Sequence, residues 1–286
     1  MGGRSQENFI LENGRITDGF DVFFWIFDDK STFDATHWHT AIEIMYVLGG
    51  EIDITSNHQT VTLKAGDIYL VDTKTAHSTK SINGNQAVLL QIPYPFLKKF
   101  IPDIDNYSFH FDCHTDNPVL KTKLLKLKEL LHQMQVVYEV NPKGGLLRFN
   151  SLLFELLFLL YHSFAKPLTG IQSKQHIKNF QRLEPVLQYT NDHYSQPIAL
   201  SEITELIGLT EAEFHSFFEE NMGISYSRYV DELRLSHIYH DLTGTDYDVE
   251  VLAAIYGFSD MEAFRSLFSQ EFCMTPEEYR KKKFSE

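Results

Sequence analysis

The sequence predicts an α+β multidomain fold, with an N-terminal β-barrel and a helical hairpin followed by an all-α domain that contains two helix-turn-helix motifs. Three observations support this prediction. Short β-branched and aromatic runs separated by turn residues occupy residues 1–112, helical periodicity begins near residue 116, and one helix–turn–helix pattern occurs twice after residue 180. A chain of 286 residues is also more typical of two domains than of one.

The strands expected in residues 1–112 are short and closely spaced. They are the runs 52–54, 61–63, 68–71 and 88–92, and they alternate with the turn signals Gly49-Gly50, Ser56-Asn57, Ala65-Gly66 and Asn83-Gly84. This spacing suits β-hairpins, and many short hairpin-connected strands favour a barrel or a sandwich.

Residues 113–165 are expected to form a helical hairpin, with helices over 116–140 and 146–165. Its apolar surface exceeds what a small barrel can bury. A dimer interface is therefore one prediction, and complete packing within the monomer is the alternative. The longest apolar run, 152–161, is interrupted by Glu155 and is shorter than the roughly 20 residues that span a bilayer, so we expect a buried helix and no membrane partner.

Residues 166–178 are expected to be a linker, because they are polar and contain Pro167 and Gly170. From residue 179 to residue 286 we expect only helices. Within this half, one pattern occurs twice: a helix, a three-residue turn that contains glycine, and a second helix. The first unit consists of 200–207, the turn Gly208-Leu209-Thr210 and 211–222, and the second of 249–256, the turn Gly257-Phe258-Ser259 and 260–272.

This layout is that of a helix-turn-helix, whose second helix, here called the reading helix, can enter the DNA major groove. Capping boxes are predicted at the starts of three helices, and they pair Thr210 with Glu213, Ser259 with Glu262, and Thr275 with Glu278. Between the units, residues 225–242 can form a helix of roughly 27 Å. Such a spacer would hold the two reading helices near one DNA turn of about 34 Å.

About 100 residues of this half resemble the DNA-binding domain of the AraC/XylS transcription regulators. The matching positions include Gly208-Leu209-Thr210, Phe214, Gly223, Arg234-Leu235, Gly257-Phe258-Ser259-Asp260, Phe264, Phe268 and Thr275-Pro276. The resemblance implies a cytoplasmic protein that binds promoter DNA. The residues expected to face the DNA are Thr210, Glu211, Ala212, His215 and Ser216 in the first unit, and Ser259, Met261, Glu262, Arg265 and Ser266 in the second.

The charge of this half departs from the family pattern. Residues 181–286 hold 8 Lys and Arg against 20 Asp and Glu, a net charge of −12 out of −14 for the whole chain. Members of the family usually place Arg where this chain has Ser216 and Ser266, and Lys pairs where it has Glu219-Glu220 and Ser269-Gln270. Cations normally supply the salt-dependent share of DNA affinity. The cations expected to help are Arg228, Arg234, Arg265 and the run 280–283.

The N-terminal half resembles a cupin, the domain that precedes the DNA-binding half in many of these regulators. His37, Trp38, His39 and Glu43, followed by Gly50, are similar to the first cupin motif, and Gly66-Asp67 with His77 are similar to the second. The resemblance implies metal-ligand positions at His37, His39, Glu43 and His77, which would suit a divalent transition metal. The same residues with Tyr46 would otherwise line a metal-free pocket for a small-molecule effector, with a sugar as the guess by family analogy.

The two cysteines, Cys113 and Cys273, lie far apart in sequence and form no CxxC, which suits a reducing cytoplasm, and the N-terminus has no apolar secretion signal. Three functions follow from the sequence. The first is a ligand-responsive transcription regulator, which is not an enzyme. The second is a regulator that has lost DNA affinity and acts through protein partners, and the third is a cupin metalloenzyme.

Overall fold

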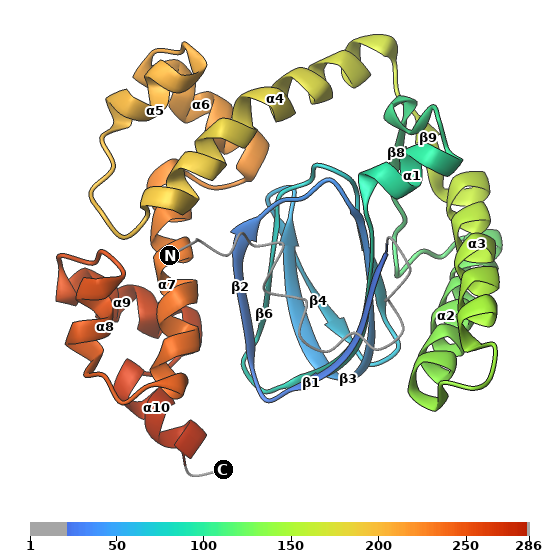
Figure 1. The fold of residues 1–286 in the computed structure, drawn as a ribbon, viewed down its shortest axis with the longest axis horizontal. Coiled ribbons are helices and arrows are strands. Elements are labelled where there is room, and N and C mark those ends of the chain that lie inside the picture. Colours follow the sequence, from blue (N-terminus) through green and yellow to red (C-terminus); the bar gives the residue numbers. More distant parts are fainter. Residues whose placement is uncertain (1–21, 285–286) are drawn as a thin grey trace.

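The computed structural model describes residues 22–284, so the first 21 residues of the expected barrel lie outside the described part. Figure 1 shows a curled β-sheet in the middle of the molecule, with a helical hairpin on one side and the C-terminal helices on the other. The predicted α+β multidomain architecture, with a cupin-like N-terminal half and a helical C-terminal half, is confirmed.

The curled sheet is antiparallel throughout, with the order β1-β7-β3-β6-β2, and β4 and β5 also pair with β3. Its strands are β1 (Phe23–Asp29), β2 (Thr32–His37), β3 (Ile42–Ser56), β4 (Gln59–Lys64), β5 (Ile68–Val71), β6 (His77–Ser81) and β7 (Asn85–Ile92). All four predicted strands lie within these elements.

The predicted turn at Gly49-Gly50 is wrong, because both glycines lie inside the long strand β3. The register with β7 shifts between Val47 and Gly49, and Gly50 has a φ of 70°. Glycine is needed there because a Cβ on Gly50 would lie 2.3 Å from the carbonyl oxygen of Gly84. The pair therefore forms a bulge that lets one strand curl across both halves of the sheet.

Residues 94–112, expected as barrel, add small elements beyond the last strand of the sheet. They are α1 (Tyr94–Phe100), the 3-10 helix η2 (Ile104–Asn106) and β8 (Tyr107–Phe109), which pairs with β9 (Ala165–Pro167). Figure 1 shows α1, β8 and β9 grouped near one end of α3, beside the edge of the sheet.

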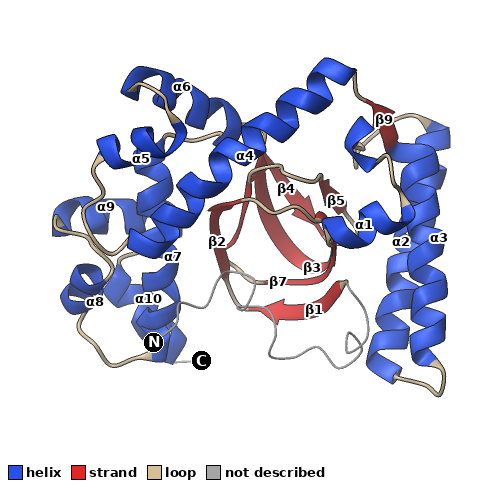
Figure 2. Cartoon of the chain, turned by 45° about the horizontal axis from the view of Figure 1, so that its top comes forward, coloured by secondary structure: helices blue, strands red, loops and turns tan. Residues whose placement is uncertain are grey.

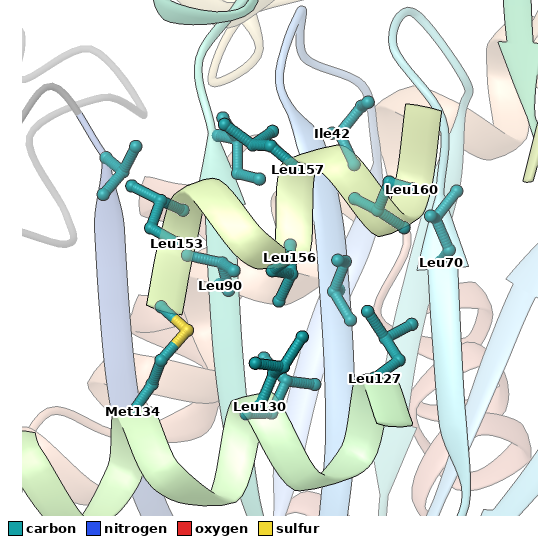
Figure 3. Close-up of a cluster of buried hydrophobic side chains, with 14 of the residues drawn as sticks. Ile42, Leu70, Leu90, Leu127, Leu130, Met134, Leu153, Leu156, Leu157 and Leu160 are labelled. Carbon is teal, nitrogen blue, oxygen red and sulfur yellow. The ribbon is translucent and has the colours of Figure 1, made fainter. Parts of the chain in front are cut away.

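The hairpin consists of α2 (Pro118–Val140) and α3 (Gly145–Phe164). Leucines from both helices interdigitate with side chains of β3, β5 and β7, and Figure 3 shows Leu127, Leu130, Leu156 and Leu160 among them. By length and composition alone, α3 could cross a membrane, but 39% of its apolar window is buried in this core.

The opposite side of the hairpin keeps large apolar side chains in solvent. Leu147, Leu125 and Phe158 are 76%, 65% and 66% exposed, and Val140 is 67% exposed. Packing on the sheet therefore covers only one face of the two helices.

The expected linker 166–178 is largely helical, because α4 (Gly170–His193) begins within it. Thr169 caps this helix through a capping box with Gln172, a signal that outweighs the polar composition and the glycine. Figure 2 shows α4 crossing from the β9 side of the molecule to the C-terminal helices.

The C-terminal half contains only helices among its described residues: α5 (Leu200–Ile207), α6 (Glu211–Met222), α7 (Tyr226–Gly244), α8 (Val249–Ile255), α9 (Met261–Phe272) and α10 (Pro276–Phe284). The capping boxes of Thr210 with Glu213 and of Thr275 with Glu278 are confirmed. The box at Ser259 is wrong, because Asp260 caps α9 by accepting from the backbone N–H groups of Glu262 and Ala263. A carboxylate one residue later competes for the same donors.

Candidate functional site

Three histidines meet where β2 and β6 pair. His37 ends β2, His77 begins β6 opposite it, and His39 lies in the loop that follows β2. One ring nitrogen of each lies within 4.8 Å of the others. Glu43 of β3 joins them, with Oε2 3.1 Å from His39 Nε2 and Oε1 3.7 Å from His77 Nε2.

Backbone carbonyls orient all three rings. The Nδ1 atoms of His37, His77 and His39 lie 2.8, 3.0 and 3.2 Å from the carbonyl oxygens of Ala35, Thr75 and Ala41. A carbonyl only accepts, so each Nδ1 donates in these contacts, and the other nitrogen, Nε2, is the one that can face a ligand. This is the arrangement that orients imidazoles as metal ligands.

Burial controls the electrostatics of the cluster. It lowers the pKa of His77 to about 3, with a further contribution from His37, so this ring is neutral. Burial alone would raise the pKa of Glu43, but a hydrogen bond from His39, the charge that His77 and His39 carry when protonated, and a hydrogen bond from Gln91 bring it to about 2. His77 Nε2 is buried and has no hydrogen-bond partner among the described residues. A buried lone pair without a donor is costly, and a cation would satisfy it.

The donor set therefore fits a divalent transition metal, because three imidazoles lie together and the carboxylate of Glu43 lies beside two of them. Gln91 of β7 was missed by the sequence reasoning. Its Nε2 donates to Glu43 Oε2 at 2.6 Å and fixes that carboxylate. In β7, Gln91 follows Ala87 and Leu89 at intervals of two residues. Ala87 and Leu89 pack in an apolar cluster inside the curled sheet. The alternation of side chains along the strand could therefore have predicted that Gln91 points to the same inner face.

Tyr46 does not join the cluster, contrary to expectation. It packs against the apolar cluster between the sheet and the hairpin, together with Ile42 and Ile44 of the same strand. Successive side chains of a strand point to opposite faces, so Tyr46 cannot share the face of Glu43, three residues earlier.

The residues expected to face DNA lie at the surface of α6 and α9. Eight of the ten are exposed, whereas Met261 and Arg265 are half-buried. Both helices present their N-terminal turns, which can donate backbone N–H groups to phosphate.

The arginines expected to help are already engaged. Arg265 binds Glu250 at 2.6 Å and Glu277 at 2.7 Å, and Arg228 binds Glu232 and Glu271. Arg234 and Arg280 donate to backbone carbonyls. In this arrangement internal acceptors hold the guanidinium groups that phosphate would need.

Strand β2 binds the helical half directly. Phe33 lies 5.1 Å from Phe272 of α9 and 6.0 Å from Tyr239 of α7, measured between ring centroids. The buried carboxylate of Glu232 on α7 accepts from the backbone N–H of Thr36 at 3.2 Å and from its hydroxyl at 2.8 Å. Thr36 immediately precedes His37.

Strand β6 makes the second link. Lys80 lies 3.0 Å from Glu271 of α9, which also binds Arg228 of α7. Burial raises the pKa of Glu271, but Lys80 and Arg228 bring it below its usual value, so this carboxylate is ionised. Both strands that carry cluster histidines are therefore tied to the helical half.

A cavity of about 230 Å³ lies between the sheet, α4 and the end of α6, and the histidine cluster does not line it. Its wall includes Trp38, Lys74, Tyr94 and Phe180, with the Lys74 ammonium 5.0 Å from the Tyr94 ring centroid. This volume is below the range of about 300–1,000 Å³ that accommodates drug-sized ligands.

Comparison with known proteins identifies both halves. Residues 203–282 match the helix-turn-helix domain family of the AraC type, and residues 24–93 match the cupin domain family. A solved structure of ToxT from Vibrio cholerae is 12% identical and superposes with a TM-score of 0.52, covering 91% of this chain and 97% of that one. This similarity supports the fold.

Two sequence relatives are regulators by name. The HTH-type transcriptional activator RhaS of Enterobacter sp. (strain 638) is 25% identical over 251 residues, which cover 85% of this chain and 86% of that protein. An uncharacterised HTH-type transcriptional regulator of Staphylococcus aureus (strain COL) is 23% identical over 84% of this chain. The chain spans 31% of the length of that larger protein.

Proposed function

We propose that this chain, a member of the AraC/XylS family with an N-terminal cupin domain, regulates transcription by binding promoter DNA through α6 and α9 and responding to a ligand at the histidine cluster. The relatives are transcription regulators by name, so we assign no catalytic residue. Such a regulator acts on DNA in the cytoplasm.

The observation that carries the proposal is the position of β2 and β6. His37 and His77 contribute to the cluster, and the residues beside them contact the helical half: Thr36 binds Glu232, and Ala76 packs in the apolar cluster of the first unit. A ligand that moves either histidine also shifts these contacts. Two sites become coupled when a shared element has different energies in two ligand states.

The ligand chemistry follows from the donor set. His37, His39, Glu43 and His77 would hold a divalent transition metal, which would supply a Lewis-acid centre for a small oxygen-bearing effector such as a sugar. The carbonyls of Ala35, Ala41 and Thr75 would keep the ring orientation, and Gln91 would keep Glu43 in place.

The test is selection of genomic fragments by the purified full chain over a range of salt concentrations, with and without Zn²⁺, Mn²⁺ or Ni²⁺. We expect one promoter class to be enriched, and metal to change its affinity about 5- to 100-fold. The salt dependence should be shallow, because few cations face the DNA. Glu232→Gln should reduce the metal response, whereas Asp231→Asn is the matched control. If no fragment binds at the lowest salt concentration, DNA binding is excluded.

A second candidate is a regulator without DNA affinity that acts through a protein partner. The internal engagement of Arg228, Arg234, Arg265 and Arg280 favours it. In that case the quadruple variant with Ser216→Arg, Glu219→Lys, Glu220→Lys and Ser266→Arg should acquire binding that the natural chain lacks. Tight operator binding by the natural chain would rule out this candidate.

The exposed face of the hairpin supports a homodimer. Leu125, Leu147 and Phe158 are apolar and lie mostly in solvent, and an isologous contact would bury them. Light scattering should then give twice the chain mass for the natural protein and the mass of one chain for the double variant Leu147→Glu with Phe158→Glu.

A third candidate, a metalloenzyme, would need stoichiometric metal and turnover. Metal analysis of untagged protein can exclude it if no stoichiometric metal is found.

A further inference from the structure

A second group of metal-ligating side chains lies outside the histidine cluster, in the segment between β8 and α2. A carboxylate oxygen of Asp112, the thiol of Cys113 and a ring nitrogen of His114 all lie within 4.8 Å of one another. The histidine cluster contains no sulfur ligand, so the two groups differ in chemistry as well as in position.

The spacing of the sulfur and nitrogen atoms matches zinc. Cys113 Sγ lies 3.6 Å from His114 Nδ1. For tetrahedral zinc, with Zn–S about 2.3 Å and Zn–N about 2.1 Å, two such ligands would be about 3.6 Å apart. One ion can therefore bind both atoms without a change in their separation.

A residue from another loop supports the imidazole. Asp67, in the turn between β4 and β5, has Oδ1 3.4 Å from His114 Nε2, and its Oδ2 accepts from the backbone N–H of Lys64 at 2.9 Å. A carboxylate on the far nitrogen of a ligating histidine fixes the tautomer in which Nδ1 is free for the metal. The sequence separation of 47 residues between Asp67 and His114 makes this a tertiary arrangement and not only a local turn.

The surroundings hold the thiol in place. Cys113 is half-buried and packs against the apolar cluster inside the sheet, which includes Val47, Ile54 and Leu63. Asp112 accepts from the backbone N–H of His114 at 2.9 Å, which fixes the turn. Two carboxylates and a potential thiolate in one place favour a divalent cation over an empty site.

We propose that Asp112, Cys113 and His114 bind one Zn²⁺ ion, with Asp67 as the positioning residue for His114. Binding replaces the S–H bond of Cys113 with a Zn–S bond and releases one proton to solvent. Three protein ligands leave a fourth position for water or another ligand. The ion would tie the start of α2 to the turn between β4 and β5.

Cobalt(II) titration of the reduced full chain tests the site, because a thiolate ligand produces a near-ultraviolet charge-transfer band that a cluster of histidines and carboxylate cannot produce. We expect the band to rise to saturation as cobalt is added and Zn²⁺ to displace it. The matched control is Cys273→Ser, which removes the other cysteine and should leave the band unchanged.

Cys113→Ser should abolish the band, and His114→Ala should weaken cobalt binding at least about tenfold. Asp67→Asn should weaken it about 10- to 100-fold while the band remains at saturation, as expected for a residue that acts through the ligand. Circular dichroism establishes that each variant is folded. The proposal is overturned if the natural chain shows no band, or if the band disappears in Cys273→Ser and persists in Cys113→Ser.

Discussion

The two helix-turn-helix units share one fold but contact the cupin half differently. The first unit (α5 and α6) meets it through loops, because Trp38 and Ala76 join its apolar cluster. The second unit (α8 and α9) receives the face of a strand, because Phe33 and Ala35 of β2 lie within its core. Among the described residues, only the second unit adds ion pairs to this contact. They join Glu271 of α9 to Lys80 of β6 and to Arg228 of α7. A change in β2 should therefore reach the second unit first.

The largest effect is expected from Phe33→Ala. This side chain is 5% exposed and packs on Phe272 and Tyr239, so its loss should lower the free energy of unfolding by about 3–5 kcal/mol. Chemical denaturation measures the loss, and hydrogen exchange should show more protection lost in α8 and α9 than in α5 and α6. Phe33→Leu, the conservative control, should cost less. Equal loss in both units would contradict the comparison.

Glu232→Gln should cost about 2–4 kcal/mol, because the amide cannot satisfy both Thr36 donors and the Arg228 guanidinium. Partial proteolysis should then release the cupin half from the second unit more readily. Asp231→Asn changes the neighbouring, more exposed carboxylate and should have little effect. If the two variants behave alike, the Thr36 contact has no special role.

The loop beside the first unit should respond to pH. Burial raises the pKa of Asp72 to about 6, although backbone N–H groups of Phe109 and Thr73 oppose the shift. The folded state then binds this proton more tightly than the unfolded state. Stability contributed by Asp72 is therefore present near pH 4 and is lost as the pH rises through 6. A pKa raised from 3.8 to about 6 corresponds to about 3 kcal/mol.

Asp72→Asn isolates this effect, because asparagine does not titrate. The difference in unfolding free energy between the natural chain and the variant should change by about 2–3 kcal/mol between pH 7 and pH 4, in favour of the natural chain at low pH. Denaturant titrations at both pH values measure it. A constant difference would show that Asp72 titrates normally.

The smallest effects concern the ends of the reading helices. Gly223, which follows the last residue of α6, has a φ of 77°, whereas Cys273, which follows the last residue of α9, has a φ of 56°. A left-handed conformation strains a residue with a Cβ. Cys273→Gly should therefore stabilise the second unit by about 0.5–1 kcal/mol, and Gly223→Ala should destabilise the first by about 1 kcal/mol. Thermal unfolding of both variants tests the pair, and the same sign in both would contradict the strain argument.

Much of the fold was predictable because its signals are local. The capping box of Thr210 with Glu213 and the left-handed Gly208 lie within a few residues of the structure they determine. Resemblance to the cupin motifs grouped His37, His39, Glu43 and His77, and the structure places these four side chains near one another. The prediction for Tyr46 was wrong because Tyr46 follows Glu43 by three residues in the same strand, and an odd spacing places the two side chains on opposite faces.

The sequence by itself determined the helices, most turns, the apolar faces and the acidic character of the C-terminal half, because these depend on neighbouring residues and on composition. Only the tertiary structure decided which carboxylates occupy the arginines and which strand enters the second unit. Thr36 and Glu232 are 196 residues apart, and Arg228 and Glu271 are 43 apart. No local pattern specifies such pairs, because they depend on how two packed halves place their surfaces against each other.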